Sequence, residues 1–344
     1  GGINTQLRHY EDFPTRPLDL FNMLPTIDGY ESAPGWAILG NEIASSNGNI
    51  NHLAAFALDT ESFYTVGITS KKFMELSSGT WTSRHAANAY TMAATDHAHT
   101  TFYNNVLYAG IPASGTANAL TQWTGTGNIT RVAGSPRNAR WAEWFGNFLV
   151  TGGTWASTTY NATRIYRSAI GDPVTHPGDY TDLVATPYPV MKLYTIGQML
   201  VAYKQYGISV LHVTGDDLLP FEPDQIPTRA GLALSEAIGV GGDAHVYMSD
   251  NNFYRFDGYS APQPVGTGIV SLVHDKLAAG STVLGGYDVR SPQREAYWFL
   301  TNVALAADAV GPNSAASTNG YFVYHVPTQS WARGDLGTSA PHCF

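Results

Sequence analysis

The sequence predicts an all-β fold, a closed β-propeller of six blades with about four antiparallel strands each. Two landmarks recur along the chain in phase: an apolar strand that runs into a small or polar turn, and an outer hairpin that closes each unit. The composition agrees, since only 13% of the residues are charged, 12% are aromatic, and the chain contains 35 glycines and 19 prolines. Few charges with many turn formers and aromatic residues favour strands over helices.

The clearest copy of the repeated unit is the stretch 240–266. His245–Met248 reads as a short strand, Ser249–Asn252 as a polar turn and Phe253–Phe256 as a second strand. Ala233–Ile238, just before this stretch, can supply one more strand. About four short strands in roughly forty residues is the size of one propeller blade.

The apolar strand recurs at intervals of 42 to 51 residues, the length of a blade with short insertions. Its six copies are Ser62–Ile68, Asn105–Ile111, Asn147–Gly153, Gln198–Lys204, Ala244–Asp250 and Glu295–Thr301. The outer hairpin recurs at Phe73–Arg84, Leu120–Ala133, Arg164–His176, Ser209–Asp224, Phe253–Gly266 and Phe322–Asp335. If the ring does not close, the alternative is an open pair of β-sandwich sheets.

Residues 1–31 are expected to form an N-terminal arm and lead-in segment, and residues 32–344 the propeller. The arm has little periodicity, so a disordered leader is one interpretation. Its apolar residues instead favour packing on this subunit or on a neighbour; they are Leu18, Leu20, Phe21, Met23 and Leu24. A strand near Trp36–Leu39 is expected to complete the last blade, which would remove two exposed sheet edges.

Two insertions interrupt the repeat, one near 267–290 and one at 304–319. The first is expected to contain a short helix that Thr267 caps and Gly280 ends. The apolar residues at helical spacing are Ile269, Leu272, Val273 and Leu277. The second insertion is loop-like.

Composition also limits the partners. The net charge of −9 argues against tight binding to nucleic-acid backbones. Cys343 is the single cysteine, so an internal disulfide and a cysteine zinc site are excluded. The sequence contains no apolar run long enough to span a membrane and no signal-peptide pattern, and the glycosylation sequons at Asn128 and Asn161 are therefore interpreted as chance matches.

Common enzyme motifs are absent from the sequence, including the phosphate-binding Gly-Lys-Ser/Thr loop, the HExxH pair, the EF-hand loop and the GxSxG elbow. His97 and His99 are the best metal candidate, because alternate residues of a strand point to one face. No third ligand can be assigned, so a polar stretch that leads into a strand is the preferred interpretation. We assign no catalytic residue, cofactor or metal ligand.

Asp216 and Asp217, with Glu222 and Asp224, form the densest acidic cluster. Paired carboxylates can bind calcium or hydrolyse a glycoside. A solvated hairpin tip is the preferred interpretation. The chain therefore gives no positive indication of an enzyme.

One stretch combines basic and aromatic residues: Arg131, Arg137, Arg140, Trp141 and Trp144. It could contact a nucleic-acid backbone or a protein. Such residues more often cover the face of a sheet with their apolar parts.

Two propeller signatures are only partly present. Ser77–Trp81 preserves the end of the Ser-x-Asp-x-Gly-x-Thr-Trp box of sialidases, but it lacks the Asp and is not repeated. Tyr324 and Trp331 have the spacing of a kelch blade, which the other units lack. Neither family is supported.

A different resemblance covers residues 138–266 best. Ala139–Val150 (ARWAEWFGNFLV) is followed by Arg164–Pro173 (RIYRSAIGDP), and this order resembles the blades of virion propeller proteins of short-tailed phages. Asn252–Gly258 with Pro264–Gly266 is similar to the next hallmark of that group. Asn22–Pro25, with Asp28-Gly29-Tyr30 and Pro34-Gly35, is similar to its N-terminal segment.

This resemblance implies a structural virion protein, either a tail nozzle or a head-closure hub that stabilises DNA. It implies a homo-oligomeric ring, expected to be hexameric, that contacts the portal, the adaptor and other tail proteins. The protein would be made in the host cytoplasm and assembled into the virion. Genomic DNA would pass through without sequence-specific binding, since a negative wall lets it slide.

Two other functions stay open. The chain can instead be a carbohydrate- or protein-binding propeller with aromatic loops at one mouth of the ring. It can also be a glycan-cleaving propeller enzyme that uses Asp217 or Glu222.

Overall fold

The computed structural model describes most of the chain between residues 20 and 337. The described residues are 20–21, 23–26, 29–32, 43, 45–48, 50–57, 62–85, 90–93, 96–112, 120–132, 138–156, 159–216, 219–274, 277, 282–288, 295–301 and 319–337. The chain divides into two compact units. The first contains Gly1–Trp36 and Ala230–Pro341, and the second contains Ala37–Arg229 and His342–Phe344.

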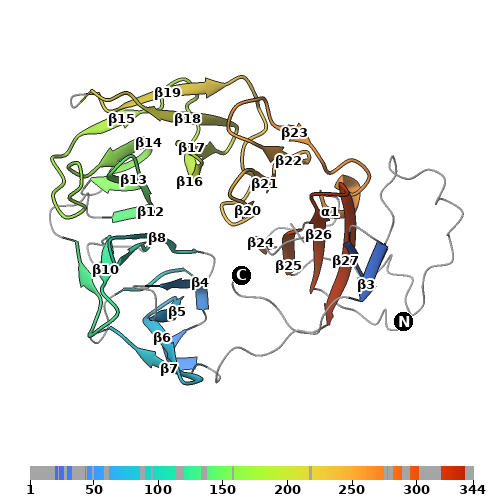
Figure 1. The fold of residues 1–344 in the computed structure, drawn as a ribbon, viewed down its shortest axis with the longest axis horizontal. Helices are drawn as coiled ribbons and strands as arrows, with labels where there is room; N and C mark the ends of the chain where they lie inside the picture. The colour runs from blue at the N-terminus through green and yellow to red at the C-terminus, as the bar shows by residue number, and fades with distance from the viewer. Residues whose placement is uncertain are drawn as a thin grey trace, which may run out of the picture. The chain divides into compact units, whose positions relative to one another are not determined.

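The described part of the second unit consists of four antiparallel sheets of four strands, each with its strands in chain order (Figure 1). A 3-10 turn, η2 (Ser45–Asn47), precedes them. The first two sheets contain β4 (Ile50–Ala57), β5 (Phe63–Thr69), β6 (Phe73–Ser77), β7 (Thr80–Ser83), β8 (His99–Tyr103), β9 (Val106–Gly110), β10 (Thr121–Trp123) and β11 (Thr130–Arg131). The other two contain β12 (Asn138–Phe145), β13 (Phe148–Ala156), β14 (Thr159–Arg167), β15 (Tyr180–Asp182), β16 (Val190–Ile196), β17 (Met199–Lys204), β18 (Gly207–Val213) and β19 (Phe221–Ile226).

The first strands of these four sheets, β4, β8, β12 and β16, lie side by side and run in the same direction. His52 Nε2 on β4 lies 2.9 Å from Thr100 Oγ1 on β8, and further along both strands the Phe56 and Phe102 ring centroids are 5.5 Å apart. Hydrogen bonds that involve side chains advance in the same way from β8 to β12 and from β12 to β16. Four-stranded meanders that pack in chain order with their first strands adjacent are β-propeller blades.

Apolar side chains fill the space between consecutive sheets of this unit. One cluster, which includes Val66, Leu107 and Trp123, joins the first sheet to the second, and another, which includes Trp141, Leu193 and Phe221, joins the third to the fourth. At Gly110 the backbones themselves approach, because an added Cβ would lie 2.8 Å from the Arg140 carbonyl oxygen. Consecutive sheets therefore pack face to face through apolar side chains, which agrees with the all-β fold that the sequence predicts.

The first unit contains two larger sheets and a hairpin. One sheet is formed by β20 (Ile238–Val240), β21 (His245–Met248), β22 (Phe253–Phe256) and β23 (Gln263–Pro264). The other is formed by β24 (Thr282–Asp288), β25 (Glu295–Thr301), β26 (Asn319–His325) and β27 (Ser330–Gly337), and β1 (Leu20–Phe21) adds to β27 as a parallel strand. The hairpin consists of β2 (Met23–Thr26) and β3 (Gly29–Ser32).

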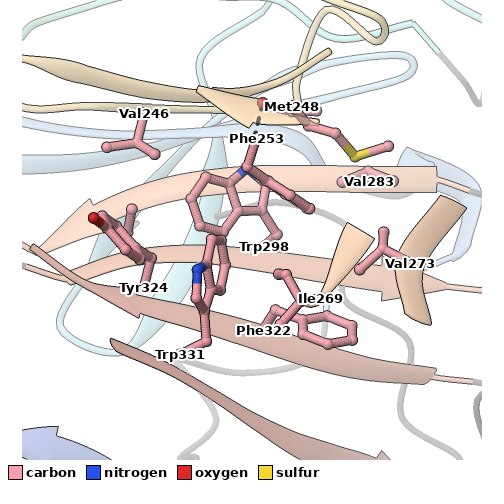
Figure 2. Close-up of a cluster of buried hydrophobic side chains, with 12 residues drawn as sticks. Val246, Met248, Phe253, Ile269, Val273, Val283, Trp298, Phe322, Tyr324 and Trp331 are labelled. Carbon is pink, nitrogen blue, oxygen red and sulfur yellow. Dashed lines mark hydrogen bonds between the residues drawn. The ribbon is translucent and has the colours of Figure 1, made fainter. Parts of the chain in front are cut away.

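The core of the first unit is built around three aromatic side chains, Phe253, Trp298 and Trp331, which are labelled in Figure 2. The ring centroids of Phe253 and Trp298 are 4.9 Å apart, those of Phe253 and Trp331 are 5.0 Å apart, and those of the two indoles are 5.3 Å apart. Both indole N–H groups are satisfied by backbone carbonyls: Trp298 Nε1 donates to Ala237 O (3.3 Å) and Trp331 Nε1 to Val265 O (2.7 Å). The centre of this core is therefore apolar without an unpaired indole.

Three expectations from the sequence need correction. The described residues form five four-stranded antiparallel blades, so the prediction of six such blades is wrong. Strands β24–β27 form a five-stranded mixed sheet together with β1 instead. The expected helical insertion near 267–290 is also wrong. The described helix in this segment, α1 (Val270–His274), is only five residues long, and its Val273 packs into the core shown in Figure 2, so it is part of the core packing and not an insertion. The strand that extends this sheet is β1, whereas the expected Trp36–Leu39 strand lies outside the described residues.

The insertion at 304–319 lies almost entirely outside the described residues, of which Asn319 begins β26. The expected arm at residues 1–31 contributes β1, β2 and most of β3. Closure of the ring and the boundary at residue 32 stay predictions.

Candidate ligand-binding face

In each sheet of the second unit, two turns lie at the same end. These are the turn between the first and second strands and the turn between the third and fourth strands, because the strands alternate in direction. Since the first strands run in the same direction, these ends lie together across the four sheets. We call this end of the second unit the turn face.

Three of the turns are tight hairpins whose two central residues have positive φ angles. Asn104 and Asn105 have φ of 48° and 61°, Gly146 and Asn147 have φ of 57° and 67°, and Ser78 and Gly79 have φ of 49° and 79°. Positive φ at both central residues defines a type I′ turn, which favours Asn and Gly and matches the twist of the flanking strands. An added Cβ at Gly146 would also lie 2.5 Å from Val213 Cγ2, so the hairpin is fixed against the neighbouring sheet.

Aromatic residues border these hairpins. The Tyr103 and Trp144 rings are stacked, with centroids 3.4 Å apart and an interplanar angle of 12°. Phe56 packs between Phe102 (5.5 Å) and the buried Trp123 (6.0 Å). These side chains form an aromatic row over three consecutive sheets, made of Phe56, Phe102, Tyr103 and Trp144, and the contact of Phe56 with Trp123 connects the row to the core.

A third component is the loop Ser168–His176 between β14 and β15. Its backbone is held by hydrogen bonds from Ala169 N to Thr175 O (2.7 Å) and from Gly171 N to Asn147 O (2.7 Å). The Asp172 carboxylate accepts hydrogen bonds from the N–H groups of Val174 (2.9 Å) and Thr175 (3.2 Å). This network leaves Ile170 62% exposed on an ordered loop.

Exposed apolar side chains gather at the turn face. The large hydrophobic residues exposed there are Phe63, Phe102, Ile170, Val174, Tyr180, Val213 and Leu219, with Phe63 at 80% and Leu219 at 70%. At the opposite end of the same four sheets, the described residues of this kind are Tyr160, Val184 and Tyr188. Contiguous exposed apolar surface marks interaction sites in soluble proteins.

A polar cluster lies along the first strands, behind the turn face. His99 is buried: the Ala142 N–H donates to its Nδ1 (3.3 Å), and its Nε2 has no hydrogen-bond partner among the described residues. Burial, with Lys192 and His52 nearby, holds the pKa of His99 well below its usual value, so the ring is neutral. Lys192 is also buried, with Nζ 4.5 Å from the centre of the Trp141 ring.

Glu143 belongs to the same cluster. Its Oε1 accepts a hydrogen bond from Thr195 Oγ1 (3.0 Å). Burial raises the pKa of Glu143 to about 8, and the bond from Thr195 only partly opposes this. The carboxyl group is therefore largely protonated at neutral pH, and it adds little negative charge to this strand.

The two histidines that the sequence proposes as metal ligands have different hydrogen-bond partners. His97 precedes β8, and its Nδ1 lies 2.7 Å from the Asn51 carbonyl oxygen, while His99 lies in the polar cluster. In the described part of the chain, no group of three His, Cys, Asp or Glu residues is arranged to hold a metal ion. Both imidazoles are buried and are held by backbone groups.

The acidic candidates lie on the β18–β19 hairpin. Asp216 is exposed in the turn, Glu222 and Asp224 are exposed on β19, and Asp217 lies outside the described residues. His212 Nε2 is 3.4 Å from Asp224 Oδ2. The structure therefore places Asp216 and Glu222 at the edge of the turn face and Asp224 further along β19.

The basic-aromatic stretch divides between different environments. Trp141 is buried and donates from Nε1 to Val190 O (3.2 Å), whereas Trp144 belongs to the aromatic row. Arg140 Nη2 lies 3.6 Å from Asp96 Oδ1, and Arg131 is exposed on β11. Arg137 lies outside the described residues.

The sequence analysis missed most of the exposed apolar residues of the turn face. Ile170 carries one usable signal, since a large aliphatic residue stands inside the turn sequence Ser168–Pro173. The kelch-like pair has a structural role: Tyr324 and Trp331 are cross-strand partners with ring centroids 4.9 Å apart.

No protein-family model matches the sequence, and no curated protein matches it either. Solved structures that it resembles are eukaryotic propeller domains. The Myceliophteria thermophila Cps50 (Swd1) β-propeller domain is 12% identical, with 83% of this chain and 92% of that chain covered and a TM-score of 0.47. The Neurospora crassa Pan2 WD40 domain is 12% identical (86% and 80% covered, TM-score 0.46), and Kluyvelomyces marxianus Hsv2 is 11% identical (79% and 80% covered, TM-score 0.38).

These findings correct the assignment to phage tail proteins. The similar structures are eukaryotic WD40 propellers and none of those named is a tail protein, so the family and the virion location are wrong. No finding supports the nozzle or hub function. The portal, adaptor and DNA partners rested on that resemblance, and they and the hexameric ring stay untested predictions. Among the described residues, no helix is both long and apolar enough to cross a membrane.

Proposed function

We propose that this chain is a non-enzymatic propeller module that binds a protein partner through the turn face. The observation that carries the proposal is the group of exposed apolar side chains at the turn face, which outnumber those of the opposite end among the residues that the structure describes. Ordered turns reduce the entropy that a partner must overcome, because the side chains are already held in place.

Protein is favoured over carbohydrate as the ligand. A sugar ring binds where a free aromatic face stands beside hydrogen-bonding side chains; Tyr103 and Trp144 stack on each other, and the most exposed aromatic ring of the face, Phe63, is apolar. The most exposed side chains of the face, Phe63, Ile170 and Leu219, carry no polar group for a hydroxyl-rich ligand. Such side chains suit the apolar anchors of a protein interface.

The test is selection from a displayed random-peptide library against the wild-type protein. Selected peptides are then measured against the variant F63S/F102S/I170S/L219S and against a matched control from the opposite end, Y160S/V184S/Y188S. We expect the face variant to lose at least about tenfold in affinity, which is about 1.4 kcal/mol, and the control to bind as the wild type does.

The proposal is wrong if the selected peptides bind the face variant as tightly as the wild type. A glycan array and a panel of chromogenic glycosides are run beside it. Glycan binding or glycoside turnover that is lost in E222Q would instead favour the carbohydrate-binding or the enzymatic alternative.

A further inference from the structure

An apolar patch crosses from the third to the fourth sheet of the turn face. It consists of Ile170, Val174, Val213 and Leu219, and we call it the Ile170 patch; their exposed fractions range from 40% to 70%. The Gly146–Asn147 hairpin joins its two halves. Gly171 N donates to Asn147 O (2.7 Å), and an added Cβ at Gly146 would meet Val213 Cγ2.

Two carboxylates belong to the same loop and turn as residues of this patch. Asp172 lies in the same loop as Ile170, and Asp216 lies in the same turn as Leu219, where its Oδ1 accepts a hydrogen bond from Leu219 N (3.4 Å). Hydrogen bonds from Thr175 and from the Val174 N–H hold the pKa of Asp172 below its usual value, so this carboxylate is ionised at neutral pH. Glu222 is a further exposed carboxylate on β19, next to the same turn.

Three described basic residues that lie near the patch in the sequence have carboxylate partners or are neutral. Arg167 Nη2 forms an ion pair with Asp179 Oδ2 (2.8 Å), and His212 lies 3.4 Å from Asp224. Burial lowers the pKa of His176, which leaves this ring neutral at pH 7. The described part of the patch is therefore apolar at its centre and negative at its border.

We propose that the partner segment that docks here is a basic amphipathic peptide, with apolar side chains that contact the Ile170 patch and Lys or Arg side chains that face Asp172 and Asp216. Charge complementarity with the border selects the basic partner, and the net charge of −9 adds long-range attraction. This inference rests on the proposed function, since it names the kind of partner that the turn face binds. These carboxylates would repel an acidic segment, and an uncharged apolar segment would gain no electrostatic attraction from them.

The probe is a synthetic amphipathic peptide of about 18 residues composed of leucine and lysine, with matched peptides in which glutamate or glutamine replaces lysine. Fluorescence anisotropy measures the affinity of each peptide at about 50 mM and about 300 mM salt. The variants are I170S/L219S and D172N/D216N. Asn at position 172 keeps an oxygen that can accept the two loop hydrogen bonds, so the loop geometry should persist.

The matched control is D243N/D250N, which removes the same charge from exposed turns of the first unit. We expect the lysine peptide to bind the wild type and the control equally. Its affinity should fall about three- to tenfold in D172N/D216N and at least about tenfold in I170S/L219S. The glutamate peptide should not bind.

Three outcomes overturn the inference. Equal affinity for D172N/D216N and wild type removes the role of the carboxylates. An equal loss in D243N/D250N shows attraction to the whole charge rather than to this border. Tighter binding of the glutamine peptide, lost in I170S/L219S, refutes the basic partner but leaves the turn face as a binding surface, which separates the failure of this inference from the failure of the proposed function.

Discussion

Replacing Glu143 by Gln should flatten the pH dependence of stability. The folded state holds the proton of Glu143, because its pKa is raised from 4.5 to about 8. Below pH 4.5 the Glu143 carboxyl group is protonated in both the folded and the unfolded chain, so it does not change the free energy of unfolding. As the pH rises from 4.5 to 8, the unfolded chain releases the proton and the folded chain keeps it, and stability falls. Above pH 8 the loss is complete and constant.

The size of the effect follows from the pKa values. Each pH unit between them corresponds to about 1.36 kcal/mol. The interval from 4.5 to 7 is about 2.5 units, which gives an upper limit of about 3.4 kcal/mol at pH 7. Glu143 retains partial exposure and solvent screens it, so we expect about 1–3 kcal/mol. A Gln side chain at 143 keeps an oxygen that can accept the Thr195 hydrogen bond, and it cannot ionise.

The assay is urea unfolding at several pH values between 4.5 and 8.5, followed by tryptophan fluorescence. The difference in unfolding free energy between E143Q and wild type should grow with pH and level off above pH 8. E222Q makes the same chemical change at an exposed site and serves as the matched control. Parallel pH curves for E143Q and wild type would refute the reasoning.

Three further substitutions test the packing. Gly285→Ala should destabilise the protein by about 1–3 kcal/mol, because the new Cβ would lie 2.4 Å from the Ile238 backbone nitrogen; Gly242→Ala, with open space at its Cβ, is the control. Lys204→Met should cost about 1.5–3 kcal/mol, since the buried ammonium donates to the carbonyls of Leu183 and Thr186 (2.7 Å for Thr186). Trp298→Ala should cost about 3–5 kcal/mol by opening a cavity in the core of Figure 2. Denaturant midpoints measure all three, and an unchanged midpoint in any of them contradicts the packing described for that site.

Local strand patterns could be predicted from the sequence. The strands expected at His245–Met248 and Phe253–Phe256 have the bounds of β21 and β22, because alternating apolar residues between turn formers specify short strands locally. The parallel pairing of β1 with β27 could not be predicted in this way. It joins residues about 310 positions apart, and two residues of strand carry no periodicity.

The candidate site was only partly accessible to sequence reasoning. Trp144 was recognised as a candidate contact residue, but its role depends on Tyr103 of the neighbouring sheet, which the sequence does not place beside it. The raised pKa of Glu143 arises in the same way, since burial against β16 is a property of the assembled sheets. The exposure of Ile170 could have been predicted from the sequence, because an aliphatic residue inside a polar turn is expected to lie at the surface.

The edge position of β1 has a consequence for biosynthesis. Leu20 and Phe21 leave the ribosome long before Ser330, which begins their partner strand, and at about 5–20 residues per second the delay is roughly 15–60 s. The stretch 37–229 is contiguous in sequence, and all of its described strands have been synthesised well before Ser330 is. The sheets of 37–229 should therefore be able to form on the nascent chain while β1 still lacks its partner strand.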